Sequence, residues 1–242
     1  MSRIAKSLSL VSVLTMGSRI LGLLRDVLFF SAFGASVFGE AFILAFTIPN
    51  LFRRMLGEGT LSSAFIPVYA ETRKKSSKDA FDLMNKVLGR LMVVLSLLIV
   101  FVVSLSYGAA KGDWFDSDKW SNGSMLNSIT FGYVLFICAS AIMVGALNTR
   151  GSFFAGALSP ILLNLFMIST LAFFGVSLGW SGSDLAMVLC LSVLLAGFVQ
   201  FLLPFLQLRM ADGWRWKLDL GRSQELDRIK SIFLVGAMGA AV

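Results

Sequence analysis

Charged residues are scarce in this chain of 242 residues, and histidine is absent. Only 14% of the residues are charged and 57% are hydrophobic, whereas soluble proteins have about 25% charged and about 45 to 50% apolar residues. The mean hydropathy of +0.81 is correspondingly high. This composition excludes a soluble domain of any size, and it predicts an all-α polytopic membrane protein.

The lack of histidine removes the commonest metal ligand and the usual proton shuttle. The two cysteines, Cys138 and Cys190, both lie in apolar runs and have no neighbouring thiol. We therefore expect them to be small hydrophobic core residues, and we expect no metal site.

Acidic residues are also few, because 14 Asp and Glu face 21 Lys and Arg, which gives a net charge of +7. In a soluble protein this excess would suggest a nucleic-acid partner. In a membrane protein, Lys and Arg are expected to accumulate in the cytoplasmic loops. We therefore expect membrane lipids, and no nucleic acid, as partners.

Four long stretches of low charge can each hold a membrane-spanning helix of roughly 20 residues. They cover residues 91–110, 120–149, 151–183 and 185–208. The first 55 residues differ, because charges recur there and leave uncharged gaps of about a dozen residues. A dozen helical residues cover only about 18 Å, whereas the hydrocarbon core is about 30 Å thick. Two helices joined by a turn within 33–39 must therefore carry charges at membrane depth.

The loops predict the orientation through the positive-inside bias. Basic residues gather at 73–78 and 209–230, whereas 108–128 holds several acids. With the amino terminus in the cytoplasm, the chain forms a six-helix N-terminal transmembrane lobe at 1–208 and a cytoplasmic linker at 209–228. A seventh transmembrane helix then starts at 229–242, where the chain stops after 12 uncharged residues, too few to cross.

Polar and charged residues of the first helix recur at spacings of three and four, which places them on one helical face. These are Ser12, Thr15, Arg19, Gly22 and Asp26, with Ser18 and Arg25 at the side. A second stripe contains Thr47, Asn50 and Arg54, and Pro49 leaves a backbone carbonyl free one turn earlier.

Each arginine near the bilayer centre costs about 2.5 to 3.5 kcal/mol, so we expect these side chains to face inward. They would line a hydrated cationic cavity. Guanidinium groups offer paired donors to phosphate oxygens, so the favoured ligand is anionic, a phosphate or a pyrophosphate.

A simpler interpretation needs no ligand. Arg19 and Asp26 would pair within the fold, and Arg53 and Arg54 would extend to the cytoplasmic surface. Glu58 would either cap an interfacial helix or pair with an arginine as a gate.

Three segments together resemble the MurJ/MviN family of lipid II flippases, in the MOP exporter superfamily. They are "SRILGLLRD", "FGEAFILAFTIPNLFRRMLGEGTLSSAFIPVYAE" and "GALNTRGSFFAGALSPILLN". The resemblance implies 14 helices, with two six-helix lobes around a central cavity and a final helix pair. This chain would supply the first lobe and the start of helix seven, and the C-terminal lobe would be its missing partner.

By resemblance, Arg19, Arg25 and Arg53 bind substrate in the cavity, supported by Asp26, Arg54 and Glu40, with Glu58 as a gate. The implied activity is to flip undecaprenyl-pyrophosphate-linked peptidoglycan precursor, lipid II, from the cytoplasmic to the outer leaflet of the bacterial inner membrane. The family role is transport in cell wall biogenesis, which maintains cell shape. No bond is made or broken, so the resemblance implies no enzyme and no cofactor. Coupling would come from the membrane potential or from a monovalent ion bound outside this chain.

Two other functions remain open from the sequence. One is a flippase for another lipid-linked oligosaccharide, or a drug/cation antiporter of the same superfamily. An antiporter would more naturally carry inward acids than inward arginines. The other is a non-transporting membrane scaffold, in which the arginine stripe would be dispensable.

Overall fold

The computed structural model describes residues 3–112 and 114–239, with side chains in these ranges except at 3–8, 56–58, 60 and 236–239. In this part of the chain the structure is helical and contains no strand. The helices are α1 (Arg3–Phe33), α2 (Val37–Phe52), the π-helical η1 (Arg53–Gly59), α3 (Thr60–Lys75), α4 (Ser77–Lys111), α5 (Asp118–Thr130), α6 (Tyr133–Asn148), α7 (Phe154–Thr170), the π-helical η2 (Leu171–Ser177), α8 (Gly182–Asp212) and α9 (Gln224–Gly239).

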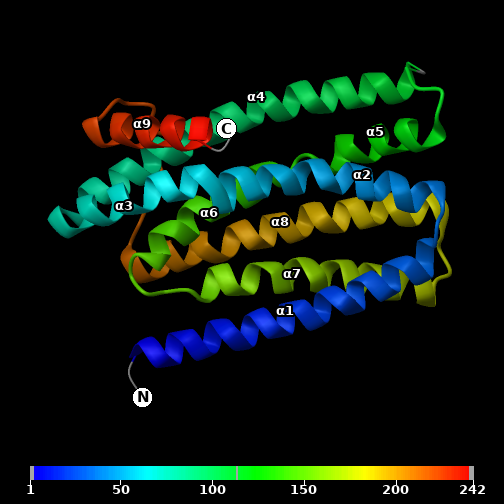
Figure 1. Cartoon of the computed structure of the whole chain (residues 1–242), viewed down its shortest axis with the longest axis horizontal. Helices are drawn as coiled ribbons and strands as arrows, with labels where there is room; N and C mark the ends of the chain where they lie inside the picture. Colours follow the sequence, from blue (N-terminus) through cyan, green and yellow to red (C-terminus); the bar gives the residue numbers. More distant parts are fainter. Residues whose placement is uncertain (1–2, 113, 240–242) are drawn as a thin grey trace.

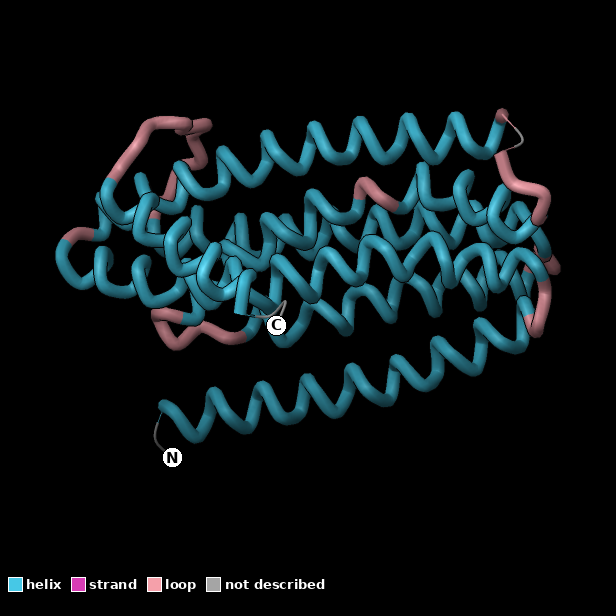
Figure 2. The backbone as a smooth tube through the Cα atoms, turned by 45° about the horizontal axis from the view of Figure 1, so that its top comes forward, coloured by secondary structure: helices cyan, strands magenta, loops and turns pink. Residues whose placement is uncertain are grey.

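The helices run back and forth along one axis, so their connections gather at two ends (Figure 1). The α1–α2, α4–α5 and η2–α8 connections lie at one end, and the α3–α4, α6–α7 and α8–α9 connections lie at the other (Figures 1 and 2). The described chain thus crosses the bundle six times before α9, which confirms the predicted helical lobe. The turn expected within 33–39 is also present, since α1 ends at Phe33 and α2 begins at Val37.

Serine side chains start two of the helices. The Ser36 hydroxyl accepts a hydrogen bond from the Gly39 amide at 3.2 Å, and the Ser76 hydroxyl accepts one from the Asp79 amide at 3.2 Å. Both bonds satisfy amide groups that lack a partner in the first helical turn. They set where α2 and α4 begin after sharp reversals.

Three helical stretches among the described residues are long and apolar enough to cross a membrane: Ser77–Lys111, Phe154–Ser177 and Gly182–Asp212. The pair α5 and α6 qualifies as a fourth, although it bends by 45° at the break. These four correspond to the long runs of low charge in the sequence. The stretches α1 and α2 to α3, which carry the charges that recur near the amino terminus, are not among these spans of the described residues.

Two of the crossings are distorted rather than straight. Pro49 lies inside α2, and the chain then adopts the π-helical η1 before it continues as α3. Proline removes one backbone donor, and π-helical turns often occur at functional sites. The bend between α5 and α6 was not predicted, because no proline or charge marks Phe131 and Gly132.

The core consists of two clusters of buried side chains, one toward each end of the bundle. Phe42, Tyr133 and Leu189 belong to the first, whereas Tyr69 and Met84 belong to the second. Helix α2 packs along α5, α6 along α8, and α1 mainly along α7. The outer surface of α1 is apolar and exposed, which suits a helix in contact with lipid or with other helices.

The expected linker at 209–228 is shorter in the structure. Helix α8 continues to Asp212, and Gly213 ends it with a φ of +67°, a left-handed conformation that glycine adopts without strain. Helix α9 begins at Gln224, five positions before the predicted start at 229. Within the expected linker at 209–228, only residues 213–223 are therefore non-helical. The sequence-based prediction placed the start of this helix at the beginning of the apolar run. The charged residues before 229 are solvated rather than apolar, so the first turn of α9 was not predicted.

Candidate functional site

A cavity of about 660 Å³ lies among the helices of the lobe. Its walls come from α1, α2, η1, α3, α6, α7 and α8. It therefore combines the two charge-bearing crossings near the amino terminus with helices that are apolar by composition. The cavity lies between the helices from which the sequence predicts inward-facing side chains, and its use as a binding site stays a prediction.

Three arginines line this cavity: Arg25, Arg53 and Arg54. Among the described lining residues none is acidic, and the other polar ones are amides, hydroxyl side chains and one phenol. They are Asn50, Ser62, Tyr133, Ser140, Asn148, Ser159, Asn164 and Gln200. The space is polar and cationic, which favours an anionic ligand with further hydrogen-bonding groups.

Arg25 is held at the cavity wall from two directions. Its Nη1 donates to Asn164 Oδ1 at 3.0 Å, and its Nη2 and Nε donate to Asp26 Oδ1 at 2.7 and 2.9 Å. The Arg25 side chain is 24% exposed, whereas the Asp26 side chain is 52% exposed. Asn164 Nδ2 also donates to the Ser18 carbonyl at 3.0 Å, so this amide joins α7 to α1. The guanidinium is thus oriented while part of it remains open to a ligand.

Arg53 and Arg54 begin the π-helical segment η1. Arg53 Nε donates to Asn50 Oδ1 at 2.9 Å, one turn earlier in α2. The wider π-helical turn changes the direction in which successive side chains leave the backbone. Both neighbouring arginines line the same cavity.

The structure does not bring every predicted site residue to this cavity. Arg19 and Asp26 are exposed on α1 and are not among the lining residues, although Asp26 reaches the site through its ion pair with Arg25. The Glu40 carboxylate pairs with Lys119 Nζ at 2.9 Å, at the end of the lobe where α2 begins. The side chain of Glu58 lies outside the described residues. Roles in substrate binding or gating for these residues stay predictions.

Asn164 and Gln200 were not predicted as site residues from the sequence. Both lie in long apolar helices, are 6% and 2% exposed, and line the cavity. Gln200 Nε2 donates to the Ser159 carbonyl, and the Ser140 hydroxyl donates to the Gln200 carbonyl, which ties α8 to α7 and α6. A single amide within an apolar run was the available signal, because such a group must find a partner when it is buried.

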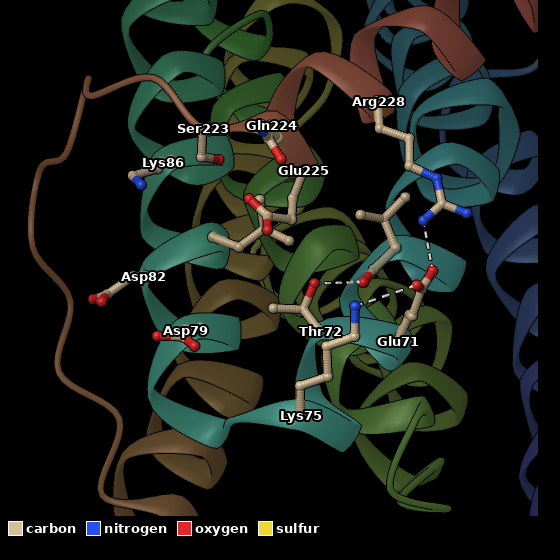
Figure 3. Close-up of a pocket in the computed structure, with 12 residues that line it drawn as sticks. Glu71, Thr72, Lys75, Asp79, Asp82, Lys86, Ser223, Gln224, Glu225 and Arg228 are labelled. Atoms are coloured by element: carbon tan, nitrogen blue, oxygen red, sulfur yellow. Dashed lines mark hydrogen bonds and ion pairs between the residues drawn. The ribbon is translucent and has the colours of Figure 1, made fainter.

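A second, smaller hollow of about 420 Å³ lies where α3, α4 and the start of α9 meet (Figure 3). Its charges are mixed, because four acids and three bases line it. Glu71 Oε2 accepts from Arg228 Nη1 at 2.5 Å, and Lys75 Nζ lies 3.6 Å from the other Glu71 oxygen. The hydrogen bond from Arg228 is the main cause that lowers the pKa of Glu71, at the loop end of α3. Because acids outnumber bases by one around it, the hollow is less suited to an anion than the central cavity.

Comparison with known proteins assigns the family. The model of the family described as lipid II flippase MurJ matches residues 29–242. A probable lipid II flippase MurJ from Buchnera aphidicola is 39% identical over 208 residues, which cover 83% of this chain and 40% of the relative. A lipid II flippase MurJ from Burkholderia cenocepacia is 35% identical over 212 residues, covering 86% and 40%.

A solved structure agrees with this assignment. It is a lipid II flippase MurJ in an inward closed conformation, with a TM-score of 0.71 and 28% identity, and the match covers 95% of this chain and 47% of that one. The chain thus spans less than half the length of these relatives. The matched family model covers most of the chain, and the fold agrees over nearly all of it, so this chain belongs to the lipid II flippase MurJ family.

Proposed function

We propose that this chain forms the N-terminal lobe of a flippase that moves lipid II from the cytoplasmic to the outer leaflet of the bacterial inner membrane. The observation that supports this proposal best is the cavity of about 660 Å³ lined by Arg25, Arg53 and Arg54, with no acid among its described lining residues. In this proposal the arginines bind the pyrophosphate, and a second lobe closes the cavity from the other side.

The physical chemistry of the substrate agrees with such a cavity. A pyrophosphate and a sugar-peptide headgroup are strongly hydrated, so they cross the membrane only in a polar space, whereas the polyprenyl tail can stay in lipid. Guanidinium groups bind phosphate oxygens through paired hydrogen bonds. An inside-negative membrane potential favours outward movement of negative charge by about 2.3 kcal/mol per charge per 100 mV. Alternating access then requires the two lobes to rock against each other.

The cavity argues against an antiporter for cationic drugs. A cationic cargo needs acids to neutralise it, and the described wall offers three arginines instead. The buried amides Asn148 and Gln200 add acceptors, because Asn148 Oδ1 and Gln200 Oε1 have no hydrogen-bond partner among the described residues.

Arg25→Ala in the complete protein tests the proposal. Growth complementation in a strain depleted of its own flippase should be lost, together with translocation of lipid II in reconstituted vesicles. Membrane abundance should stay near the wild-type level, because Arg25 lines a hollow and is not a packed core residue.

Two further variants make this test specific. Arg25→Lys should restore only part of the activity, since an ammonium group keeps the charge and loses the paired donors. Lys78→Ala removes one positive charge from an exposed residue at the start of α4, outside the cavity, and should behave as wild type. Normal growth and translocation with Arg25→Ala at wild-type abundance would favour a scaffold role and contradict the cationic-cavity mechanism.

A further inference from the structure

The segment 213–221 is a non-helical strap that is fixed along α4. Asn85 is its main anchor: Asn85 Nδ2 donates to the Arg215 carbonyl at 3.2 Å, and Asn85 Oδ1 accepts from Trp214 Nε1 at 3.1 Å. Arg90 Nη2 donates to the carbonyls of Leu220 and Gly221 at 2.7 and 2.9 Å. These bonds satisfy side-chain and carbonyl groups of an irregular segment and hold the strap in one position.

The strap borders two adjoining hollows on the side of the bundle. The larger is about 670 Å³ and is lined by Phe205, Arg209, Gly213, Trp214, Arg215 and Trp216. The smaller is about 150 Å³, and its lining is entirely apolar or aromatic. Phe205, Trp214 and Trp216 line both, so a polar compartment and an apolar compartment share one wall. Leu88, Met92, Met143 and Phe201 complete the apolar one.

The two tryptophans of the shared wall differ in their exposure to solvent. Trp214 is only 1% exposed, and its ring contacts Phe205 edge to face at a centroid distance of 5.4 Å. Trp216 is 44% exposed. Aromatic side chains with this mixture of burial and exposure are typical of the membrane–water interface.

The polar compartment carries an unbalanced positive charge. Arg209 and Arg215 both line it and are exposed, and no acid is among its described lining residues. Asp212, the acid nearest to Arg209 in the sequence, is instead held in an ion pair with Arg150. Within the part of the chain that the structure covers, no ion pair joins an acid to either guanidinium.

We propose that these two hollows form a binding site for an anionic glycerophospholipid of the surrounding membrane. The two guanidinium groups bind the phosphate of the headgroup, and one acyl chain lies against the aromatic and methionine side chains of the apolar compartment. Charge complementarity favours an anionic headgroup, and the adjoining apolar compartment favours a lipid over a free phosphate. Basic pockets between helices on the cytoplasmic side of a membrane bind anionic lipid headgroups in this manner. The site shares no lining residue with the central cavity and is independent of the function proposed above.

Lipid titration of the detergent-solubilised complete protein, followed by native mass spectrometry, tests the proposal. Phosphatidylglycerol and phosphatidylcholine of the same chain length are the probes. The wild type should bind phosphatidylglycerol more tightly than phosphatidylcholine. Arg209→Gln combined with Arg215→Gln should weaken phosphatidylglycerol binding about tenfold, because charge-assisted hydrogen bonds to phosphate are lost. Binding of phosphatidylcholine should change less.

The matched control is Lys74→Gln combined with Lys78→Gln. It removes two positive charges from exposed side chains at the same end of the bundle and should leave lipid binding unchanged. Trp216→Ala should weaken binding of both lipids, since this side chain lines both compartments and is exposed enough to be removed without unfolding the protein. Thermal unfolding of each variant checks the fold.

Three results would overturn the proposal. The first is equal binding of the two lipids by the wild type. The second is unchanged phosphatidylglycerol binding in the double arginine variant with a normal unfolding temperature. The third is displacement of the lipid by inorganic phosphate at the same concentration, which would identify a simple anion site. Resistance to inorganic phosphate, together with weaker binding of short-chain phosphatidylglycerol, would support a lipid site.

Discussion

At the scale of single residues, the orientation of Arg25 depends on an amide from another helix. Asn164 accepts from Arg25 Nη1 and donates to the Ser18 carbonyl, so it fixes the guanidinium relative to both α7 and α1. Asp26 holds the other side of the same group. Positioning by two different partners prepares the arginine for a ligand, since less side-chain freedom is lost on binding.

Asn164→Ala should therefore impair transport even though the arginine remains. We expect lipid II translocation by the complete protein to fall about tenfold, in line with the loss of one hydrogen bond to a charged group. Asn122→Ala is the control, because that amide bonds only to the Asp118 carbonyl within α5, away from the cavity. Translocation by Asn164→Ala at the wild-type rate would mean that Asp26 alone positions Arg25.

At the scale of helices, close approach between α6 and α8 depends on Gly197. A Cβ at this position would lie 2.5 Å from Tyr133 Cδ2, closer than atoms in a packed core can come. Tyr133 is fully buried and lines the cavity, so its ring cannot move without disturbing the wall. The absence of a side chain at 197 thus sets the spacing of two cavity helices.

Gly197→Ala should destabilise the complete protein by about 1 to 3 kcal/mol, the usual cost of overpacking a core. A lower midpoint in thermal unfolding of the purified protein would record this. Gly108→Ala in α4 is the matched control, because a Cβ there meets nothing within 4 Å. Since alanine favours helix more than glycine does, the control should be neutral or slightly stabilising. Equal midpoints for the two variants would show that the α6–α8 contact is adaptable.

Helix α9 is held against α3 partly by the ion pair between Arg228 and Glu71. Both side chains are about half exposed, so the pair contributes little to global stability. The pKa of Glu71 is lowered from its ordinary 4.5 by the hydrogen bond from Arg228. The stabilising effect is consequently complete above the unfolded-state pKa and is lost as the pH falls through the folded-state value.

Glu71→Gln should accordingly increase amide hydrogen exchange in the first turns of α9 at neutral pH. The wild type should approach the exchange of this variant as the pH falls below about 4.5, after correction for the intrinsic rate. Asp82→Asn, which changes an acid of the same hollow on α4, should have a smaller effect. If the difference between wild type and Glu71→Gln persisted unchanged at low pH, the carboxylate charge would not be its source.

At the scale of the whole molecule, the grouping of connections at two ends permits a test of the predicted orientation. Ser77 and Ser117 are exposed and lie at opposite ends, after α3 and before α5 (Figure 1). Cysteines placed there can be labelled selectively, because Cys138 and Cys190 are only 1% and 0% exposed. Ser76 is less suitable, since its hydroxyl caps α4.

In intact spheroplasts, an impermeant thiol reagent should label Ser117→Cys and leave Ser77→Cys unlabelled until the membrane is permeabilised. This follows from the basic loop at 73–78 and the acidic residues within 108–128. The unsubstituted chain serves as the background control. The opposite labelling pattern would place the amino terminus outside and reverse the predicted orientation.

The sequence alone was sufficient for the properties that depend on composition and on spacing along one helix. Hydrophobic runs of spanning length predict helices wherever they occur, since backbone groups in lipid must bond within their own segment. The cost of charge at membrane depth likewise predicted an inward arginine cluster, and the structure places Arg25, Arg53 and Arg54 around one cavity.

Only the tertiary structure decided which polar groups meet. Arg19 lies on the same helical stripe as Gly22 yet does not line the cavity, whereas Asn164 and Gln200, distant in sequence, complete the wall. The bend at Phe131 and Gly132 and the π-helical turn at Arg53 rotate neighbouring side chains away from ideal helical positions. Helical periodicity determines on which face of its own helix a side chain lies. The packing of several helices then determines which of those faces meet.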